Sequence, residues 1–249
     1  MPELNKANRQ VCDVDIRVLK TLAPFLFFDT ANTTTAGLSG DSVYAMAKGQ
    51  RAIAFHNPLE GTMTIEAQVI PFKFYSLFSD GTIESTGIQA VHKKIKADGT
   101  NIKIEAANGE VKTGTVFVYP AGSFGDEDAL IKGTFASGTF TPEQTDAIVS
   151  GNEYEVGYIL NRTSGVKRVS FNNKKVPKDY FITMNTVEKD EEGVLTPYII
   201  TAYKASVERN FELSFSSEGD PASITLTFNL LADKNGDVMD IMEDTDAAE

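Results

Sequence analysis

The sequence is short of the residues on which small proteins often rely for cross-links and metal ions. Its 249 residues include one cysteine, two histidines and no tryptophan. Because Cys12 has no partner within the chain, the fold cannot depend on an internal disulfide, and a reducing compartment is expected. A chain of this length can bury a full hydrophobic core without such links. The lack of tryptophan also argues against a carbohydrate-binding module.

Long hydrophobic runs are missing as well. No apolar stretch approaches the roughly 20 residues that a membrane-spanning helix needs. The amino-terminal segment MPELNKANRQVCDVD is polar and lacks the apolar centre of a signal peptide. These features predict a soluble protein that is made in the cytoplasm and does not insert stably into a membrane.

Basic residues are outnumbered, with 23 Lys and Arg against 35 Asp and Glu and a formal net charge of −12. Such a chain repels phosphates, which argues against a conventional nucleic-acid-binding protein. The charge is uneven, because Arg162 to Lys178 holds six basic residues and no acid, whereas Asp233 to Glu249 holds seven acids and one lysine. Both stretches could be solvated surfaces. Alternatively they meet in an assembly contact, with Arg162, Lys167, Arg168, Lys174, Lys175 and Lys178 facing Glu243, Asp244 and Asp246 of a neighbouring copy.

Alternation of apolar and polar residues is the main pattern that the sequence does contain. The stretch EGTMTIEAQVIPFKFYSLFSDGTIES places Met63, Ile65, Ala67 and Val69 on one side of an extended strand. Near the carboxyl end, Phe211, Leu213 and Phe215 alternate, SSEGDPAS follows, and Ile224, Leu226, Phe228 and Leu230 alternate again, which predicts a hairpin. Further strands are expected at 42–47, 51–55, 116–119, 154–160, 167–171, 180–187 and 198–205. The fold class predicted is all-β, mainly an antiparallel sandwich or barrel.

Two short helices are expected beside these strands. Thr141-Pro142-Glu143-Gln144 has the spacing of a capping box, and Ser150-Gly151 closes the segment, so a helix is predicted over about 142–149. After Pro71, the aromatic run fits both a helix and a continued strand. We favour the helix, because a proline cannot donate a hydrogen bond within a central ladder.

Composition suggests how these elements are grouped. Residues 1–95 and 151–242 are expected to form one sandwich-like core. The Gly-, Ala- and Thr-rich region 96–140 is a possible inserted β unit, residues 141–150 are the short helix, and 243–249 is expected to be a flexible acidic tail.

The usual signatures of catalysis and metal binding are missing. His56 and His92 lie 36 residues apart, outside any metal-ligand or triad spacing. Asp233 to Asp237 is similar to a calcium loop, but its glycine falls too early, and an Asn-Gly turn is the better interpretation. The acid pairs Asp126 with Asp128 and Glu191 with Glu192 stand in solvated loops. No catalytic, cofactor-binding or metal-binding residue is assigned, and no cofactor is expected; an acid-based hydrolase is the weakest alternative.

Three stretches carry a resemblance to a known family. They are LSGDSVYAMAKGQRAIAFHNPLEGTMTIEAQVIPFKFYSLFSDGTIES, GVKRVSFNNKKVPKDYFITM and ERNFELSFSSEGDPASITLTFNLLADKNGDVMDIME. Two strands, an alternating strand and an aromatic segment ended by Asp-Gly resemble the tail-tube proteins of long-tailed bacteriophages. The likeness covers about two thirds of the chain, chiefly residues 23–84 and 151–243.

The resemblance implies a twisted β-sandwich with a flanking helix. It also implies homo-hexameric rings that stack into a tube in the virion tail, made in the host cytoplasm. DNA would pass through the lumen without specific binding, and other tail proteins such as sheath, terminator or baseplate would be partners. An acidic wall would suit that role, since it repels phosphates. Composition alone leaves open a capsid decoration protein, a baseplate component or a surface adhesion module.

Overall fold

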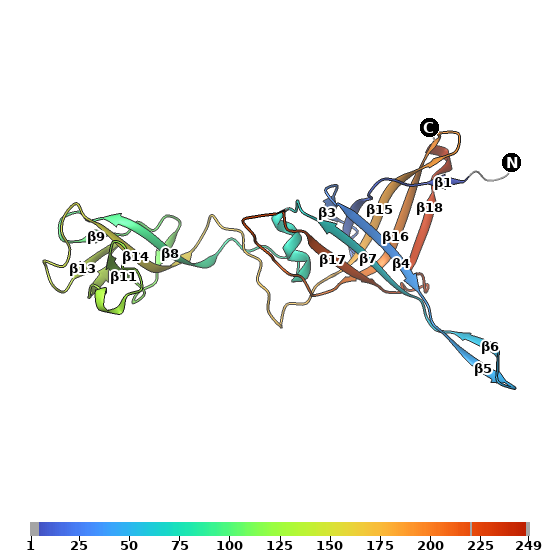
Figure 1. The fold of residues 1–249 in the computed structure, drawn as a ribbon, viewed down its shortest axis with the longest axis horizontal. Coiled ribbons are helices and arrows are strands. Elements are labelled where there is room, and N and C mark those ends of the chain that lie inside the picture. The colour runs from blue at the N-terminus through green and yellow to red at the C-terminus, as the bar shows by residue number, and fades with distance from the viewer. Residues whose placement is uncertain (1–4, 220, 248–249) are drawn as a thin grey trace. The chain divides into compact units, whose positions relative to one another are not determined.

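The computed structural model describes residues 5–219 and 221–247, which are mostly antiparallel strands. The chain divides into two compact units (Figure 1). Unit 1 consists of residues 1–82 and 170–249, and unit 2 of residues 83–169. Unit 2 is therefore an insertion in the chain of unit 1, and the all-β fold class is confirmed.

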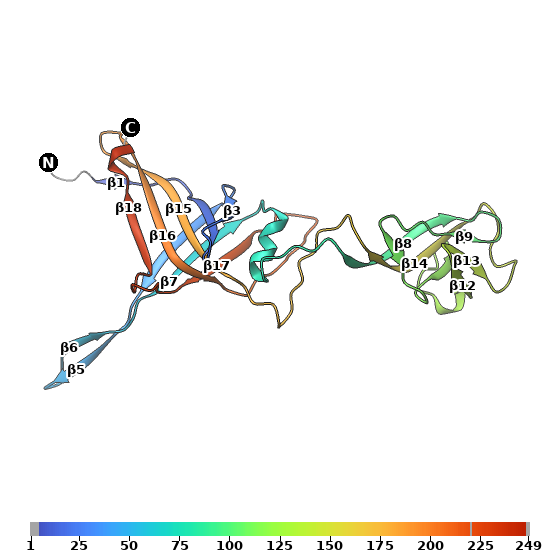
Figure 2. The same cartoon turned by 180° about the vertical axis from the view of Figure 1, so that it is seen from behind.

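Unit 1 is built on a nine-stranded sheet whose main order is β3-β2-β15-β16-β17-β7-β4, with β1 beside β15 and β18 beside β16. Figure 2 shows β15, β16 and β18 running side by side. The strands are β1 (Lys6–Ala7), β2 (Asp13–Val18), β3 (Pro24–Phe28), β4 (Thr33–Ser39), β7 (Glu60–Ala67), β15 (Asp179–Asp190), β16 (Leu195–Val207), β17 (Ile224–Leu230) and β18 (Met239–Glu243).

One face of this sheet forms the core of unit 1. The expected inward residues of β7 and β17 are buried, as the alternation predicts: Met63, Ile65, Ala67, Ile224, Leu226, Phe228 and Leu230. The aromatic segment forms the 3-10 helix η1 (Phe72–Phe78), which confirms a helix over a strand. Phe74, Leu77 and Phe78 of η1 are buried against the sheet. An edge-to-face contact of Phe74 with Phe78, at 5.6 Å between centroids, helps to fix the helix there.

Three positions expected in this core are not in it. Val69 is 67% exposed, because β7 ends at Ala67 before reaching it. Leu213 and Phe215 are 45% and 89% exposed. The expected hairpin of 211–215 with 224–230 is wrong, since β17 pairs with β7 and with β16 instead. Phe211 is half-buried among the rings of η1.

Unit 2 has its own small core. A central strand, β14 (Glu153–Arg162), pairs with β8 (Gly87–Lys96) along its whole length and with β10 (Gly109–Val111) and β11 (Phe117–Pro120) on its other side. A second sheet contains β9 (Ile102–Lys103), β12 (Gly133–Ala136) and β13 (Thr139–Pro142), and η2 (Glu127–Ala129) lies between β11 and β12. The buried residues include Ile102, Val118, Phe140 and Val156. Because β8 and β14 complete this core, the unit is wider than the 96–140 insertion suggested by composition.

The helix expected over 141–150 is also wrong. Thr141 and Pro142 end β13, where they pair with Thr134 and Gly133, and residues 143–150 form turns. Pairing within the sheet overrides the local capping signal, and Pro142 is tolerated because it is the last residue of the strand. Likewise 167–171 is not a strand, apart from an isolated bridge of Arg168 with Glu84.

Residues 243–247 of the expected acidic tail include the end of β18 (Met239–Glu243) and a short 3-10 helix. Glu243 ends β18, and the Asp244 amide donates to the Pro197 carbonyl at 3.0 Å. Residues 245–247 form the 3-10 helix η3 (Thr245–Ala247). The remaining part of the expected tail, residues 248–249, lies outside the described residues. In the part of the chain that the structure describes, no helix is long and apolar enough to cross a membrane.

Candidate assembly surface

Between β4 and β7 the chain of unit 1 leaves the sheet as a two-stranded hairpin of β5 (Ser42–Ala47) and β6 (Gln50–His56), here called the arm (Figure 1). The strands pair from Ser42 opposite His56 to Ala47 opposite Gln50. Lys48 and Gly49 form the turn, and both have positive φ, at 51° and 81°. Two positive φ values are typical of the tight turn that matches strand twist. The arm is thus a paired hairpin with one register shift, between Ala45 and Met46, rather than a loose loop.

One face of the arm is an apolar stripe made of Val43, Ala45, Ile53 and Phe55. Val43 lies opposite Phe55, and Ala45 lies opposite Ile53. Their side chains are left open to solvent, with exposed fractions of 59% for Val43, 57% for Ile53 and 59% for Phe55. Contiguous exposed apolar surface is typical of contact sites, which makes this stripe a candidate for one.

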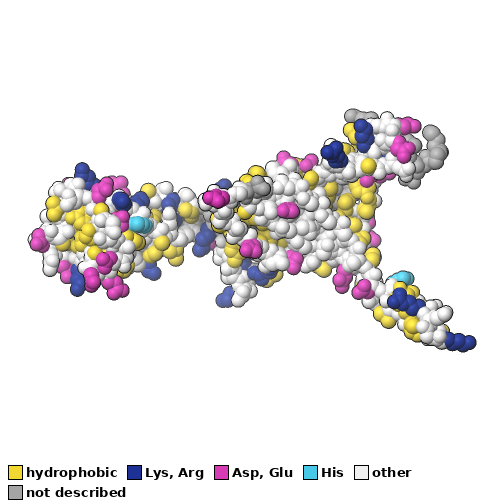
Figure 3. Space-filling view, in the orientation of Figure 1, with side chains coloured by type: hydrophobic (Ala, Val, Ile, Leu, Met, Phe, Trp, Pro, Cys, Tyr) yellow, Lys and Arg dark blue, Asp and Glu magenta, His cyan; other side chains and the backbone are white. Residues whose placement is uncertain are grey.

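The other features of the arm hold it in shape and give it positive charge. The Arg51 guanidinium lies 4.3 Å from the centre of the Tyr44 ring, a cation–π contact. Ser42 Oγ and His56 Nδ1 are 2.9 Å apart at the base. Between Asp41 and Glu60 the only charged residues are Lys48 and Arg51. Figure 3 shows basic side chains beside hydrophobic ones along the arm. The arm therefore carries net positive charge in a chain that is strongly acidic overall.

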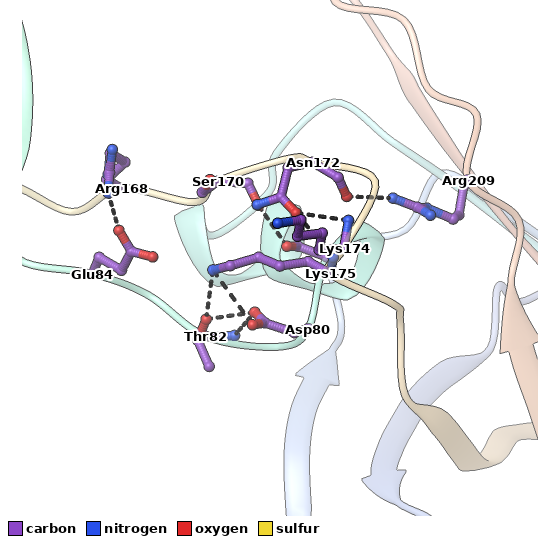
Figure 4. A network of polar contacts seen from close by, with 10 residues as sticks. Asp80, Thr82, Glu84, Arg168, Ser170, Asn172, Lys174, Lys175 and Arg209 are labelled. Carbon is purple, nitrogen blue, oxygen red and sulfur yellow. Dashed lines mark hydrogen bonds and ion pairs between the residues drawn. The ribbon is translucent and has the colours of Figure 1, made fainter.

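The basic stretch predicted as an assembly contact is divided between the two units, and its part in unit 1 is held by a polar network (Figure 4). The Lys175 ammonium lies 3.4 Å from the Asp80 carboxylate. The Thr82 hydroxyl donates to that carboxylate at 2.5 Å. This hydrogen bond, then the Thr82 amide and Lys175, lower the pKa of Asp80, against a smaller opposing effect of burial. Lys175 therefore has a structural partner within its own chain.

The loop that carries Lys174 is fixed by further hydrogen bonds. Asn172 Oδ1 accepts from the amides of Lys174 and Lys175 at 2.9 and 3.0 Å. The Asn172 carbonyl accepts from Arg209 at 3.3 Å. The side chains of Lys174 and Lys178 are exposed. These two lysines are the members of the stretch in unit 1 that present their charge outward.

In unit 2, two of the three predicted cations, Arg162 and Arg168, have partners within the unit. Arg168 forms an ion pair with Glu84, and the backbone amide of each donates to the other's carbonyl at 2.8 Å. Arg162 donates to Gln89 Oε1 at 3.4 Å. Lys167 is exposed. Arg162 and Arg168 thus help to hold β8 and its neighbours together.

The acidic residues of the predicted contact lie at the end of β18. Glu243 forms an ion pair with Lys6, which belongs to the neighbouring part of the same sheet. Asp244 Oδ1 accepts from the Asp246 amide at 3.2 Å. The contact of these acids with the basic stretch of another copy stays a prediction.

The polar residues considered for chemistry have structural surroundings. The His92 ring stacks on Phe124, with centroids 3.8 Å apart, and its Nε2 lies 3.7 Å from the Glu155 carboxylate. Asp233 Oδ1 accepts from the amides of Asn235 and Asp237 at 2.7 and 3.0 Å, so that loop is a turn stabilised by its first aspartate.

Sequence reasoning placed both strands of the arm within a residue or two but missed what the arm is. The alternation in these strands predicts that one face of each is buried. Periodicity does not show that the apolar face is left exposed. The acid-free run between Asp41 and Glu60 was the available signal.

A comparison with protein families identifies the chain. The model of the YomU/Tube protein family matches residues 9–241, nearly the whole length, so the chain belongs to that family. The match confirms the resemblance to phage tail-tube proteins, and it makes the chain a structural component of a phage tail. No curated protein matches the chain.

Proposed function

We propose that this member of the YomU/Tube family assembles with copies of itself into hexameric rings, and that the rings stack into the tube through which the phage genome passes. The observation that carries the proposal is the arm, whose apolar stripe is left exposed by the residues of unit 1 that the structure describes. Burying a large apolar side chain contributes roughly 1.5–3 kcal/mol. Three such side chains on each arm therefore favour association strongly when every copy contributes one arm.

The distribution of charge supports the conduit role. Unit 2 contains nine Lys and Arg against eleven Asp and Glu, which leaves fourteen and twenty-four for unit 1. Unit 1 thus carries a net charge of −10 out of −12. A tube built from unit 1 would repel the phosphates of DNA, because its acids outnumber its cations by ten.

The face of β4, β7 and β17 that points away from the core is well suited to line the channel. Alternate residues on this face are mostly threonine, for example Thr64 opposite Thr227 and Thr35. None of the three strands contains a lysine or arginine. Hydroxyl groups keep such a wall wetted, and without cations the backbone of DNA finds no fixed contact. Other tail proteins, such as sheath, terminator or baseplate, would meet the ends or the outside of this tube.

The proposal is tested by electron microscopy and light scattering of the purified chain. Rings with sixfold symmetry, or tubes built from them, are expected. A variant in which residues 43–55 are replaced by a two-residue turn should keep the fold of unit 1 and remain monomeric. A wild-type chain that stays monomeric at all protein and salt concentrations would overturn the proposal, and isolated shells or spikes would point to a decoration or baseplate role.

A further inference from the structure

We infer that residues 210–217, between β16 and β17, form an added strand on the free edge of β4 in a second copy of this chain. The inference rests on the proposed self-assembly and deepens it, because it names a second pair of elements that meet, distinct from the arm.

The segment has a strand's sequence without a strand's structure. Phe211, Leu213 and Phe215 alternate with polar residues. The structure nevertheless assigns no strand to the described residues between Val207 and Ile224, which are 208–219 and 221–223. Phe215 is 89% exposed, the highest fraction among the exposed large apolar side chains of the described residues. Strict alternation is expected where one face of a strand is covered, so the cover has to come from outside the unit.

The main chain of the segment is also open to a partner. Among the described residues, 210–219 take part in no hydrogen bond between backbone groups. The one local contact of its amides is that of Glu218 with the Ser216 hydroxyl, at 3.2 Å. Backbone donors and acceptors that are to be buried on assembly must be paired, and a sheet edge can pair a whole row of them.

Both ends of the segment are fixed to unit 1. Phe211 packs against Phe78 and Phe171, with ring centroids 4.5 and 5.3 Å apart. Beyond the other end, Gln68 Nε2 donates to the Pro221 carbonyl at 2.9 Å. The segment is therefore presented at a defined place, which lowers the entropy lost when it pairs.

The main strand path of the unit 1 sheet ends at β3 and β4, and of these two strands only β3 has protective features. It begins with Pro24, its pairing with β2 shifts register near Arg17, and Lys73 Nζ donates to the Phe25 carbonyl at 2.5 Å. Proline, irregular pairing and lysine are devices that prevent pairing at an edge. β4, by contrast, pairs regularly with β7 over seven residues and contains neither proline nor charge. The outer edge of β4 can therefore accept an added strand.

The chemistry of the two elements is complementary. On β4, Thr34, Ala36 and Leu38 are on the core side, because they lie opposite Ile65, Met63 and Gly61. Leu38 is 44% exposed. An added strand with Leu213 and Phe215 on that side extends the core over Ala36 and Leu38. Since β4 is uncharged, Glu212 of the added strand meets no like charge on that strand.

Disulfide trapping tests the pairing. In a Cys12→Ser background, a Ser214→Cys chain is co-assembled with chains that carry Thr33→Cys, Thr35→Cys or Gly37→Cys, which are on the solvent side of β4. Directly opposite residues have Cβ atoms about 4.5–5.5 Å apart, close enough for a bond after slight adjustment. Covalent dimers are expected with at least one of these chains. The matched control, Thr225→Cys on the interior strand β17, should give none.

A second measurement does not depend on the register of the two strands. Hydrogen exchange of the amides at 211–217 should slow at least tenfold on going from monomer to tube. The variant Phe215→Ser should unfold like the wild type but assemble more slowly.

The outcomes separate this inference from the proposed function. Tubes that form without cross-links and without amide protection overturn the strand addition alone. A wild-type chain that forms no rings or tubes overturns the proposed function and the inference with it.

Discussion

Val43 on β5 and Phe55 on β6 lie directly opposite each other on the arm, and each side chain is 59% exposed. A cross-strand apolar pair normally contributes to stability where it is covered. Here the pair is exposed to solvent, so we expect it to contribute to association rather than to folding of the monomer.

Replacing Val43 and Phe55 by serine is expected to leave the free energy of unfolding of the monomer within about 0.5 kcal/mol of the wild type, as for other surface positions. The protein concentration needed for assembly should rise at least tenfold, which light scattering measures. Ala54→Ser, on the opposite face of the arm, is the matched control and should assemble normally. Equal assembly of all three chains would remove the stripe from the interface.

Phe228 tests the core. It lies opposite Met63, and both side chains are fully buried. Phe228→Ala is expected to lower the free energy of unfolding by about 3–5 kcal/mol, because it removes buried apolar contacts and leaves a cavity. Chemical denaturation of the monomer measures the change. A loss below about 1 kcal/mol would mean that β17 does not face the core in solution.

Tyr180 carries a buried hydroxyl for which the described residues provide no hydrogen-bond partner. Burial, and after it the charge of Asp80, raise the pKa of this phenol well above its ordinary value of 10.0. The free energy of unfolding that this pKa difference contributes is therefore fully present below pH 10. It is lost as the pH rises further, because the phenol ionises at a lower pH in the unfolded chain than in the folded chain.

Tyr180→Phe should accordingly be neutral or stabilising at pH 7, since it removes an unpartnered polar group, and it should lose less stability between pH 10 and 11. Tyr154→Phe is the control, because the Tyr154 hydroxyl accepts from the Val149 amide at 2.8 Å. That change should cost about 0.5–1.5 kcal/mol at pH 7. A Tyr180→Phe chain that is destabilised as much as the control would indicate a hydrogen bond in solution.

Exposed charge is expected to affect the rate of assembly. The variant Lys174→Glu with Lys178→Glu leaves Lys175 in its contact with Asp80 and reverses two outward charges. It should assemble more slowly than the wild type at 0.1 M salt. The difference should vanish near 1 M, where the screening length falls from about 10 Å to about 3 Å. Lys20→Glu with Lys234→Glu, outside the basic stretch, controls for net charge. Stopped-flow light scattering measures the assembly rates. If both double variants slow assembly equally, the basic stretch does not steer assembly specifically.

The sequence predicted those parts of the fold that depend on contacts within one chain. Alternation in β7 and β17 placed Met63 and Phe228 in the core, because a strand with one covered face has a fixed period. The helix at 141–150 failed because Thr141 and Pro142 are taken up by pairing within β13, which a local capping signal cannot reveal. The burial predicted for Phe215 was wrong for another reason. Its alternating pattern predicts a covered face, but the single chain leaves the side chain exposed.

The candidate site was harder to predict than the fold. Charge runs drew attention to Lys175 and Glu243, yet the structure gives these residues partners within their own chain. The arm was overlooked because its strands, taken singly, look like ordinary half-buried strands. What distinguishes the arm is that none of the described residues of unit 1 covers Val43, Ile53 or Phe55, and only three-dimensional structure shows that.

An electron cryomicroscopy reconstruction of tubes assembled from the wild-type chain tests the central claim most directly. The account predicts sixfold rings in which Val43, Ile53 and Phe55 of each arm are covered by a neighbouring copy. Tubes in which the arm points into solvent, with those three side chains as exposed as in the monomer, would contradict it.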